Sequence, residues 1–254
     1  VLADMEQKGI LLDTAMFKDF ARELNEQIQR IEDSIFASVG ERFNINSTQQ
    51  LSDMLFKRLA LEPPDRSRKT SSGKLSTAAG VLENMRGQHP VIDEILEYRE
   101  LTKLKSTYVD ALPLQVNPKT GRIHTSFNQT GTVTGRVASQ DPNLQNIPTR
   151  TELGRRVRQG FIASPGTKLV SIDYSQIELR IMAHISQDEA MLEAFRQGQD
   201  IHAATAAAIY NIPLEKVDKS QRRHAKAINF GLIYGMSAFG LTRATELTLA
   251  EAEN

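Results

Sequence analysis

A long apolar stripe near the start of the chain restricts the fold more than any other feature. After Asp13, apolar side chains recur every three or four residues, at Phe17, Phe20, Leu24, Ile28, Ile31 and Ile35. This spacing places them on one face of an α-helix. Gly40 follows the stripe, and glycine is the residue type that most often ends a helix. The sequence therefore predicts one long helix that must bury its apolar face.

Shorter helices are predicted after this first one. Ser47 stands three residues before Gln50, a spacing that is typical of a capping box at a helix N-terminus. Two more helices are expected at about 76–86 and 90–110, and Pro90 lies at the first turn of the second, where proline is favoured. We therefore expect the N-terminal part of the chain to form an elongated helical pair with a loose cationic end.

The pattern changes after Pro113. Asn117–Gly121 predicts a turn that joins a short strand to another at Arg122–Phe127. Residues 129–146 are rich in Gly, Thr, Ser and Asn, and they are predicted to form a loop. A buried strand is expected at 168–174, because this run is apolar and short.

The last third of the chain is predicted to be helical. Ile177, Ile181 and Ile185 recur at intervals of four, which indicates a helix directly after the strand. Further helices are expected near 188–196, 201–210 and 218–235. Because a helical part precedes a mixed part of strands and helices, the predicted fold class is α+β.

Composition excludes several classes of protein. The chain has no cysteine, so it can form neither a disulfide nor a thiolate metal site. No apolar run approaches the roughly 18 residues that a membrane span needs, so we expect no membrane partner and a cytoplasmic location. Both ends are expected to be cut, because Val1 already lies in a helical pattern and Asn254 in a Glu/Ala-rich segment.

Charge is distributed unevenly. The 31 Lys/Arg and 31 Asp/Glu residues balance, but cations gather in the segments 63–74, 136–158 and 216–226. One such segment alone is most simply a solvated face, whereas three on a neutral chain favour a polyanionic partner. The first of them is also rich in Pro, Ser and Gly, so it is predicted to be a basic tip without regular structure.

Asp173 closes the predicted strand, where a side chain can emerge from a sheet edge into a cleft. A carboxylate there suits a divalent metal site for phosphoryl transfer, because such ions prefer hard oxygen ligands. Taken alone, an Asp in this place is more often a helix cap or a surface residue. Ser175 and Glu178 have the spacing of a capping box, which is the structural interpretation of Glu178. The functional interpretation puts the Glu178 carboxylate beside the sugar of a nucleotide.

A second constellation lies in the last predicted helix. Arg222, Lys226, Phe230 and Tyr234 are each four residues apart, so they form one slowly turning stripe on the helix. Each half of this stripe also has an explanation without a ligand: the two cations can be an exposed pair one turn apart, and the two aromatic rings can pack in a core. Together they suit a nucleoside triphosphate, because cations can hold the phosphates while an aromatic ring stacks on the base and sugar.

Three segments resemble motifs of family A DNA polymerases, of the bacterial DNA polymerase I type, and they occur in the family's order. Residues 134–150 resemble the primer-template contact loop, Asp173–Arg180 the first palm motif, and Arg222–Gly235 the nucleotide-binding fingers helix. The resemblance covers essentially the whole chain and implies a partial right-hand architecture. Its implied parts are a thumb (1–112), a partial palm (113–187) and partial fingers (188–254).

The resemblance implies roles for residues of the first palm motif. Asp173 would be catalytic and would ligate two Mg²⁺ ions, with the Tyr174 carbonyl assisting one of them. Gln176 and Glu178 would contact the nucleotide, and Glu178 would crowd out a ribose 2′-hydroxyl.

The resemblance also implies a triphosphate site. Arg222 and Lys226 would bind the triphosphate and act in catalysis, with Lys226 as the proton donor to pyrophosphate. Phe230 would stack against the nucleotide and disfavour sugars that lack a 3′-hydroxyl. Tyr234 would lie near the templating base. His202 matches the family histidine that contacts the triphosphate, although a lone His is more often structural.

Contacts with primer-template DNA are implied for a third set of residues. They are Arg99, Lys103, Ser106, Thr107, Arg136, Asn143, Gln145, Asn146 and Arg150. Arg and amide side chains can reach minor-groove acceptors that every base pair offers, so such a grip is independent of base sequence. For the four residues between 99 and 107, an ordinary amphipathic helix is an equally good explanation.

The expected function is that of a DNA-directed DNA polymerase in replication and repair, acting as a monomer on primer-template DNA and deoxynucleoside triphosphates with Mg²⁺. Family members carry a later His-Asp-Glu segment that supplies a second metal-binding carboxylate. This chain ends before it, so we expect the chain alone to be inactive. A non-catalytic duplex-binding module remains an alternative; Glu178 argues against an RNA polymerase.

Overall fold

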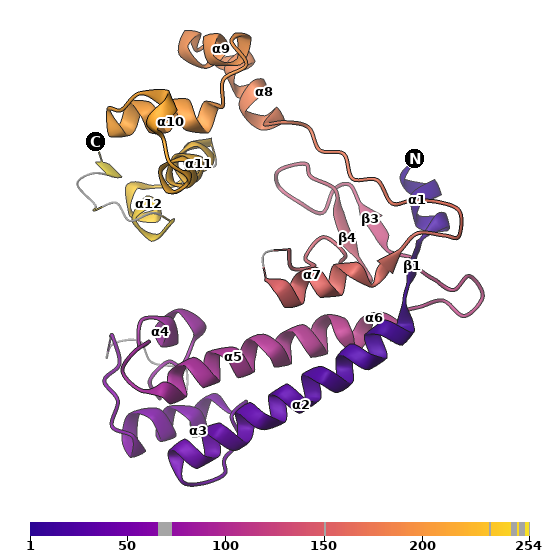
Figure 1. Cartoon of the computed structure of the whole chain (residues 1–254), viewed down its shortest axis with the longest axis vertical. Coiled ribbons are helices and arrows are strands. Elements are labelled where there is room, and N and C mark those ends of the chain that lie inside the picture. Colours follow the sequence, from indigo (N-terminus) through magenta and orange to yellow (C-terminus); the bar gives the residue numbers. More distant parts are fainter. Residues whose placement is uncertain (66–72, 150, 234, 245–247, 249–251, 254) are drawn as a thin grey trace. The chain divides into compact units, whose positions relative to one another are not determined.

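The chain divides into two compact units, Val1–Val170 (unit 1) and Ser171–Asn254 (unit 2). This computed structural model describes residues 1–65, 73–149, 151–233, 235–244, 248 and 252–253 (Figure 1). The finer division into thumb, palm and fingers segments remains a prediction. None of the helices in the described part of the chain combines the length and the apolar composition that crossing a bilayer requires.

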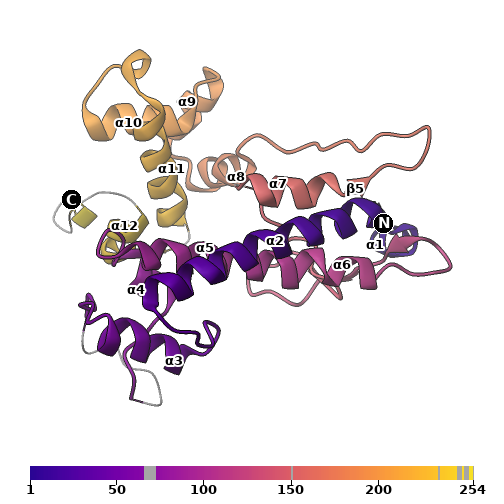
Figure 2. The same cartoon turned by 60° about the horizontal axis from the view of Figure 1, so that its bottom comes forward.

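Unit 1 is built around the long helix that the apolar stripe predicts. This helix, α2, spans Thr14–Val39; the Asp13 side chain accepts a hydrogen bond from the Met16 N–H at 2.9 Å, which caps its first turn. Gly40 ends it in the left-handed conformation, with φ of 81°. Figures 1 and 2 show α5 (Pro90–Leu104) running beside α2. The predicted helical pair is confirmed.

The other helices of unit 1 are short. They are α1 (Leu2–Lys8), α3 (Thr48–Asp53), the π-helical turns η1 (Met54–Arg58) and η2 (Lys105–Val109), α4 (Ala79–Glu83), α6 (Ala111–Leu114) and α7 (Glu152–Gln159). The helix expected at 76–86 is thus only five residues long, and the helix expected at 90–110 changes to a π turn at Lys105.

The predicted capping box of α3 forms only in half. Ser47 Oγ accepts a hydrogen bond from the Gln50 N–H, as the spacing predicts. The Gln50 side chain, however, accepts its bond from the backbone N–H of Asn44, at 2.8 Å, and not from that of Ser47. The Ser47 N–H instead donates to the Asn44 carbonyl at 3.0 Å, so the turn before the helix has already satisfied it.

Two hydrophobic cores lie along the α2–α5 pair. One gathers side chains from the end of α2, from α3 and α4, and from the start of α5, with Ile35 and Ile92 fully buried. The other gathers the start of α2, the end of α5 and α7, with Phe17 and Val157 fully buried. Ile28 packs against both. The single stripe of α2 therefore serves two cores.

Two small antiparallel sheets lie in the described part of unit 1. In the first, β1 (Ile10–Leu12) lies between β2 (Arg122–Ile123) and β5 (Phe161–Ile162); in the second, β3 (Ser126–Asn128) pairs with β4 (Ala138–Gln140). Leu11 stands opposite Arg122 and Ile162, and Phe127 stands opposite Ser139.

The prediction that residues 129–146 are entirely loop is wrong, because 138–140 form β4. The strand lacks an apolar alternation that would reveal it. Instead, the buried Ser139 hydroxyl lies 2.6 Å from the Thr125 hydroxyl, and its position depends on pairing with β3. Short-range composition does not report such pairing.

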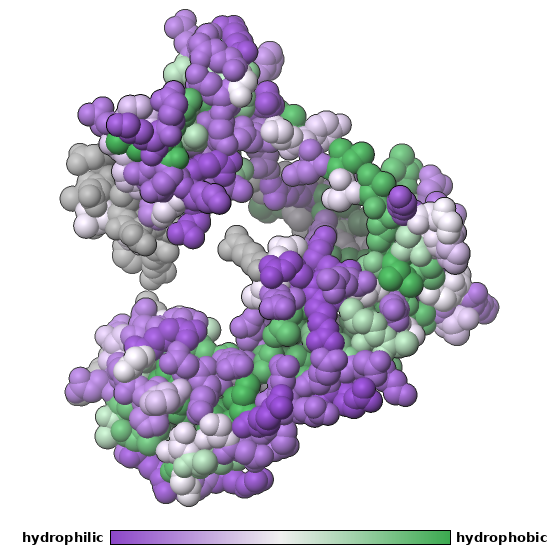
Figure 3. Space-filling model, viewed as in Figure 1, coloured by the Kyte–Doolittle hydropathy of each residue, from purple (hydrophilic) through white to green (hydrophobic). Residues whose placement is uncertain are grey.

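The buried strand predicted at 168–174 is also wrong. Among the described residues this segment has no strand partner, and Ile172 is 91% exposed. A buried strand needs neighbours at its edges to bond its backbone groups, and the described part of the chain supplies none. Hydrophobic surface is visible along the segment between β5 and α8 in Figure 3.

The described part of unit 2 is mainly helical. Its helices are α8 (Ile177–Ser186), α9 (Glu189–Arg196), α10 (Ile201–Tyr210), the 3₁₀ turn η3 (Leu214–Lys216), α11 (Lys219–Ile233) and α12 (Ala238–Ala244). The four helices predicted from about residue 177 to 235 are confirmed. The apolar core of this unit is small, with Leu179, Ala194 and Ile201 at its centre.

Gly160 offers a test of how tightly the start of α2 is packed. A Cβ at this position would overlap the ring of the fully buried Phe17, whereas a Cβ at the exposed Gly80 in α4 would meet nothing within 4 Å. We expect Gly160→Ala to lower the free energy of unfolding of unit 1 by about 1–3 kcal/mol.

Gly80→Ala is the matched control, because it should raise the free energy of unfolding by up to about 1 kcal/mol through helix propensity. Urea unfolding followed by circular dichroism measures both variants. Equal midpoints for Gly160→Ala and the unmodified chain would contradict the packing described here.

Candidate nucleotide-binding site

The candidate site lies between α10 and α11 of unit 2, which share the most extensive helix contact of that unit. Each of these two helices carries a small, fully buried side chain, Ala206 on α10 and Ala225 on α11. Small residues allow two helices to approach closely, so polar side chains at the end of this seam can reach across it.

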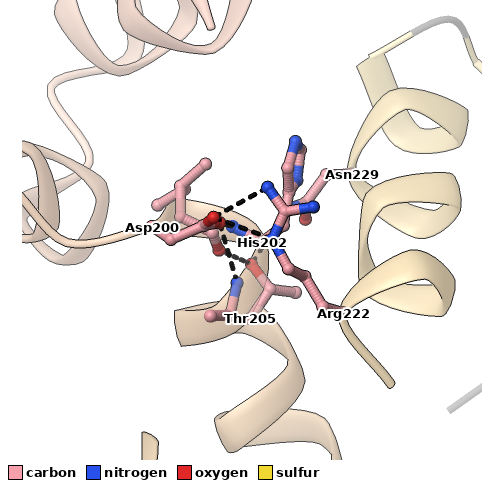
Figure 4. Close-up of polar contacts among 7 residues, drawn as sticks. Asp200, His202, Thr205, Arg222 and Asn229 are labelled. Carbon is pink, nitrogen blue, oxygen red and sulfur yellow. Dashed lines mark hydrogen bonds and ion pairs between the residues drawn. The ribbon is translucent and has the colours of Figure 1, made fainter. Parts of the chain in front are cut away.

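Asp200 joins the two helices through one carboxylate. One oxygen, Oδ1, accepts hydrogen bonds from the backbone N–H groups of His202 at 2.9 Å and Ala203 at 3.1 Å, which caps α10. The other, Oδ2, accepts from Arg222 Nε at 2.8 Å and pairs with a second guanidinium nitrogen at 2.7 Å (Figure 4). Burial opposes the ionised form, but these bonds outweigh it and lower the pKa of Asp200.

His202 lies inside this junction and is only 2% exposed. Its ring is 5.7 Å from the ring of Phe230, measured between centroids, and its Nδ1 is 3.1 Å from the side-chain nitrogen of Asn229. Desolvation lowers the pKa of His202; Asp200 opposes this effect, while Arg222 and Lys226 add to it. The imidazole is therefore held in its neutral form at neutral pH.

The predicted stripe on α11 is confirmed for the residues that the structure describes. Arg222 faces Asp200, and Lys226 Nζ lies 5.9 Å from the centroid of the Phe230 ring. Tyr234 falls outside the described residues. The helix pair thus gathers two cations, an aromatic ring and a neutral histidine, which is a combination suited to an anionic ligand with a flat apolar part.

Asp173 and Tyr174 lie in the extended segment before α8 and are exposed. The carboxylate oxygens of Asp173 are the kind of hard ligand that Mg²⁺ prefers. Within the described residues, however, no group of three His, Asp or Glu side chains could hold a metal ion. The described residues therefore do not complete a metal site around Asp173, and one carboxylate alone does not fit two ions.

The turn after Asp173 differs from the predicted capping box. The helix α8 begins at Ile177, and its N-terminal residue Gln176 has a left-handed backbone (φ 54°) and makes no side-chain capping bond. Ser175 stands one residue too early to cap the helix; its carbonyl instead accepts from Arg180 Nε at 2.9 Å. Glu178 lies half-buried in the first turn of α8.

The residues with implied DNA contacts all lie in unit 1, and part of them come together. Thr107, Asn143 and Asn146 line one cavity of about 660 Å³ between η2 and the β4 region. The Tyr108 hydroxyl donates to the Asn146 carbonyl at 2.5 Å, which ties the two walls together. Arg136 is exposed in the β3–β4 connection, and Arg150 lies outside the described residues.

Other residues of the DNA-contact set bond within the chain. The side-chain amide of Gln145 makes two hydrogen bonds at the start of β4. Its Nε2 donates to the carbonyl of Val137, the residue before β4, and its Oε1 accepts from the Ser139 N–H. The Arg99 guanidinium donates to the Thr77 carbonyl at 2.5 Å, and burial lowers its pKa. These two side chains thus already have partners.

Lys103 and Ser106 complete the set. Both are exposed on the α5–η2 stretch. Lys103 lines a second cavity of about 430 Å³ together with Arg99, and the Ser106 hydroxyl donates to the Lys103 carbonyl at 3.4 Å.

Sequence reasoning missed Asp200, Thr205 and Asn229. A signal existed for Asp200, because an Asp directly before an apolar helical run is a common N-cap. Asn229 lies three residues after Lys226, on the same face of the helix. Its partnership with α10 depends on how two helices pack, which no short-range pattern encodes.

Asp200 predicts a specific pH dependence. Because its pKa is lowered in the folded chain, its ion pair stabilises unit 2 fully above the unfolded value of about 3.9 and is lost as the pH falls through the folded pKa. Asp200→Asn keeps a capping oxygen but loses the charge. We expect it to cost about 0.5–1 kcal/mol at pH 7, since the pair is partly exposed.

The measurement is urea unfolding of both proteins from pH 3 to 8, with hydrogen exchange of the His202 and Ala203 amides as a local readout. The difference between them should shrink toward the acidic end. A difference that persists unchanged at pH 3 would contradict the ion pair as its cause.

Comparisons with known proteins place the whole chain in one family. The model of DNA polymerase family A matches residues 14–254. The chain is 51% identical over 253 residues to the thermostable DNA polymerase I of Thermus aquaticus and 53% identical over 244 residues to DNA polymerase I of Chloroflexus aurantiacus. The T. aquaticus match includes 100% of this chain but only 30% of that protein, and the C. aurantiacus match includes 96% of this chain but only 26% of that protein.

A solved structure agrees. The POL domain of Pol1 from M. smegmatis, in complex with DNA primer-template and dNTP, matches 99% of this chain and 44% of that chain. Its TM-score is 0.85 at 40% sequence identity. With a family model that matches nearly the whole length, the chain belongs to DNA polymerase family A.

Proposed function

We propose that this chain is the part of a DNA-directed DNA polymerase that grips primer-template DNA and binds the incoming deoxynucleoside triphosphate. The intact protein would extend a primer by templated nucleotidyl transfer, in which the 3′-hydroxyl attacks the α-phosphate and pyrophosphate leaves. The observation that carries this proposal is the cluster of Arg222, Lys226, His202 and Phe230 at the α10–α11 seam of a family A chain.

Each side chain of this cluster has a task that fits its chemistry. The cations of Arg222 and Lys226 bind phosphate oxygens, and Lys226 donates a proton to the leaving pyrophosphate. Phe230 stacks on the nucleotide. Gln176 and Glu178 contact the nucleotide, with Glu178 excluding a 2′-hydroxyl. Tyr234, which falls outside the described residues, would lie near the templating base.

Unit 1 supplies the grip on DNA in this proposal. Thr107, Asn143 and Asn146 line one cavity, and Lys103 and Arg136 are exposed cations. Amide and hydroxyl groups bond to sugars and minor-groove acceptors, while cations neutralise phosphates, so the duplex is held whatever its sequence. Arg99, Ser106, Gln145 and Arg150 belong to the same predicted set.

Mg²⁺ is the proposed cofactor. Asp173 and the Tyr174 carbonyl would each give one oxygen ligand, and the described residues do not supply the rest. We also predict that the protein is cytoplasmic and acts as a monomer.

Primer extension by the full-length parent protein tests the proposed activity. Asp173→Ala should lower the rate by several orders of magnitude, because the proposed metal ligand is lost. Glu215→Ala is the control, since this carboxylate is exposed on η3. Extension that Asp173→Ala leaves undiminished would refute the assigned role.

A second candidate function is a duplex-binding module without catalysis. It is favoured by the cavity that Thr107, Asn143 and Asn146 line. An intact parent that binds primer-template DNA but does not extend it would decide for this candidate.

Salt dependence tests the DNA contacts of unit 1. Lys103 is exposed, whereas Lys105, two residues away, is mostly buried and pairs with Asp110 at 2.6 Å. If Lys103 contacts a phosphate, Lys103→Ala should reduce the slope of log affinity against log salt by about 1. Lys105→Ala should leave the slope unchanged. Fluorescence anisotropy with a labelled duplex measures both, and equal slopes for Lys103→Ala and the unmodified chain would remove Lys103 from the contact set.

A further inference from the structure

A chain of hydrogen bonds runs through the α10–α11 seam and ends on the ring of His202 (Figure 4). It starts at the backbone carbonyl of Ile201, which accepts a bond from the Thr205 hydroxyl at 2.8 Å. The Thr205 oxygen lies 3.0 Å from the side-chain nitrogen of Asn229. The same nitrogen lies 3.1 Å from His202 Nδ1.

Simple counting of protons fixes the direction of every bond in this chain. Thr205 has one hydroxyl proton, which it gives to the Ile201 carbonyl, so its oxygen can only accept from Asn229. The Asn229 group that faces Thr205 must therefore be the NH₂ group. Its second proton points to His202 Nδ1, which must then offer a lone pair.

A neutral imidazole carries one proton, so a ring that accepts at Nδ1 must carry its proton on Nε2. The neutral form also fits the surroundings. His202 is buried, and the charged groups that bear on it are Asp200 on its own helix and Arg222 and Lys226 on α11. The burial and the two cations disfavour a further positive charge.

We propose that Asn229 is a positioning residue: locked by Thr205, it holds His202 in the tautomer that carries the proton on Nε2, so that this nitrogen donates a hydrogen bond to a phosphate oxygen of the bound nucleotide. Phosphate oxygens at neutral pH only accept hydrogen bonds. The other tautomer would present a lone pair at Nε2, which a phosphate repels. The last step, donation to phosphate, rests on the proposed function; the tautomer itself does not.

The tautomer can be read directly in the 254-residue chain by long-range proton–nitrogen NMR of the histidine rings. The chain has five histidines, and the signals of His202 are those that disappear in His202→Gln. We expect a protonated Nε2 and a lone pair on Nδ1. Asn229→Asp should move the proton to Nδ1, because a carboxylate only accepts.

Two further variants separate positioning from stability. Thr205→Val removes the lock without touching Asn229 and should give a mixture of both tautomers, while Thr205→Ser should restore the original one. Tyr210→Phe is the matched control. It removes the Tyr210–His224 hydrogen bond between the same two helices, at 3.0 Å, and should leave His202 unchanged.

Nucleotide binding supplies the second readout, with dATP and Mg²⁺ as the probe in isothermal titration. Thr205→Val should weaken binding roughly threefold to tenfold, since one charge-assisted hydrogen bond is partly lost, and Tyr210→Phe should not. A His202 ring protonated on Nδ1 in the unmodified chain, or a tautomer unaltered by Asn229→Asp, would overturn the proposal. If the tautomer is as expected but the unmodified chain does not bind dATP, the proposed nucleotide site fails while the role of Asn229 in positioning stands.

Discussion

The apolar stripe of α2 is the constraint on which unit 1 depends. One helix face supplies Phe17 and Phe20 to one core and Ile35 to another, and Ile28 lies at the transition between them. The α5 helix does the same from the opposite side. Both cores share these two helices, and the small sheets and the short helices of unit 1 pack against the helical pair through them. The cavity lined by Thr107 and Asn143 thereby gains fixed walls.

Unit 2 is held together in a different way. Among its described residues, the apolar core is centred on three buried side chains, and the main helix contact is bridged by polar groups. Asp200 caps one helix and pairs with Arg222 on the next, while Asn229 bonds to both His202 and Thr205. In the proposed nucleotide site, the groups that join α10 to α11 would therefore also be the groups that face the nucleotide. Stability and the proposed recognition would then depend on the same side chains.

Local sequence patterns predicted what local physics determines. The period of the α2 stripe, its end at Gly40, and the four-residue spacing of Arg222, Lys226 and Phe230 depend only on helix geometry, and the structure agrees. The two errors about strands share one cause. The strand expected at 168–174 needs partner strands, and β4 exists through its pairing with β3. Asn229 likewise acquires its place from the packing of α11 against α10.

The central claim is that nucleotide binds at the α10–α11 seam of unit 2, through side chains that this helix pair already holds in place. Hydrogen–deuterium exchange of the chain with and without dATP and Mg²⁺ tests it most directly. We predict slower exchange in α10 and α11 upon addition of dATP, with α2 and α5 unchanged. Protection confined to unit 1, or none at saturating dATP, would contradict the claim.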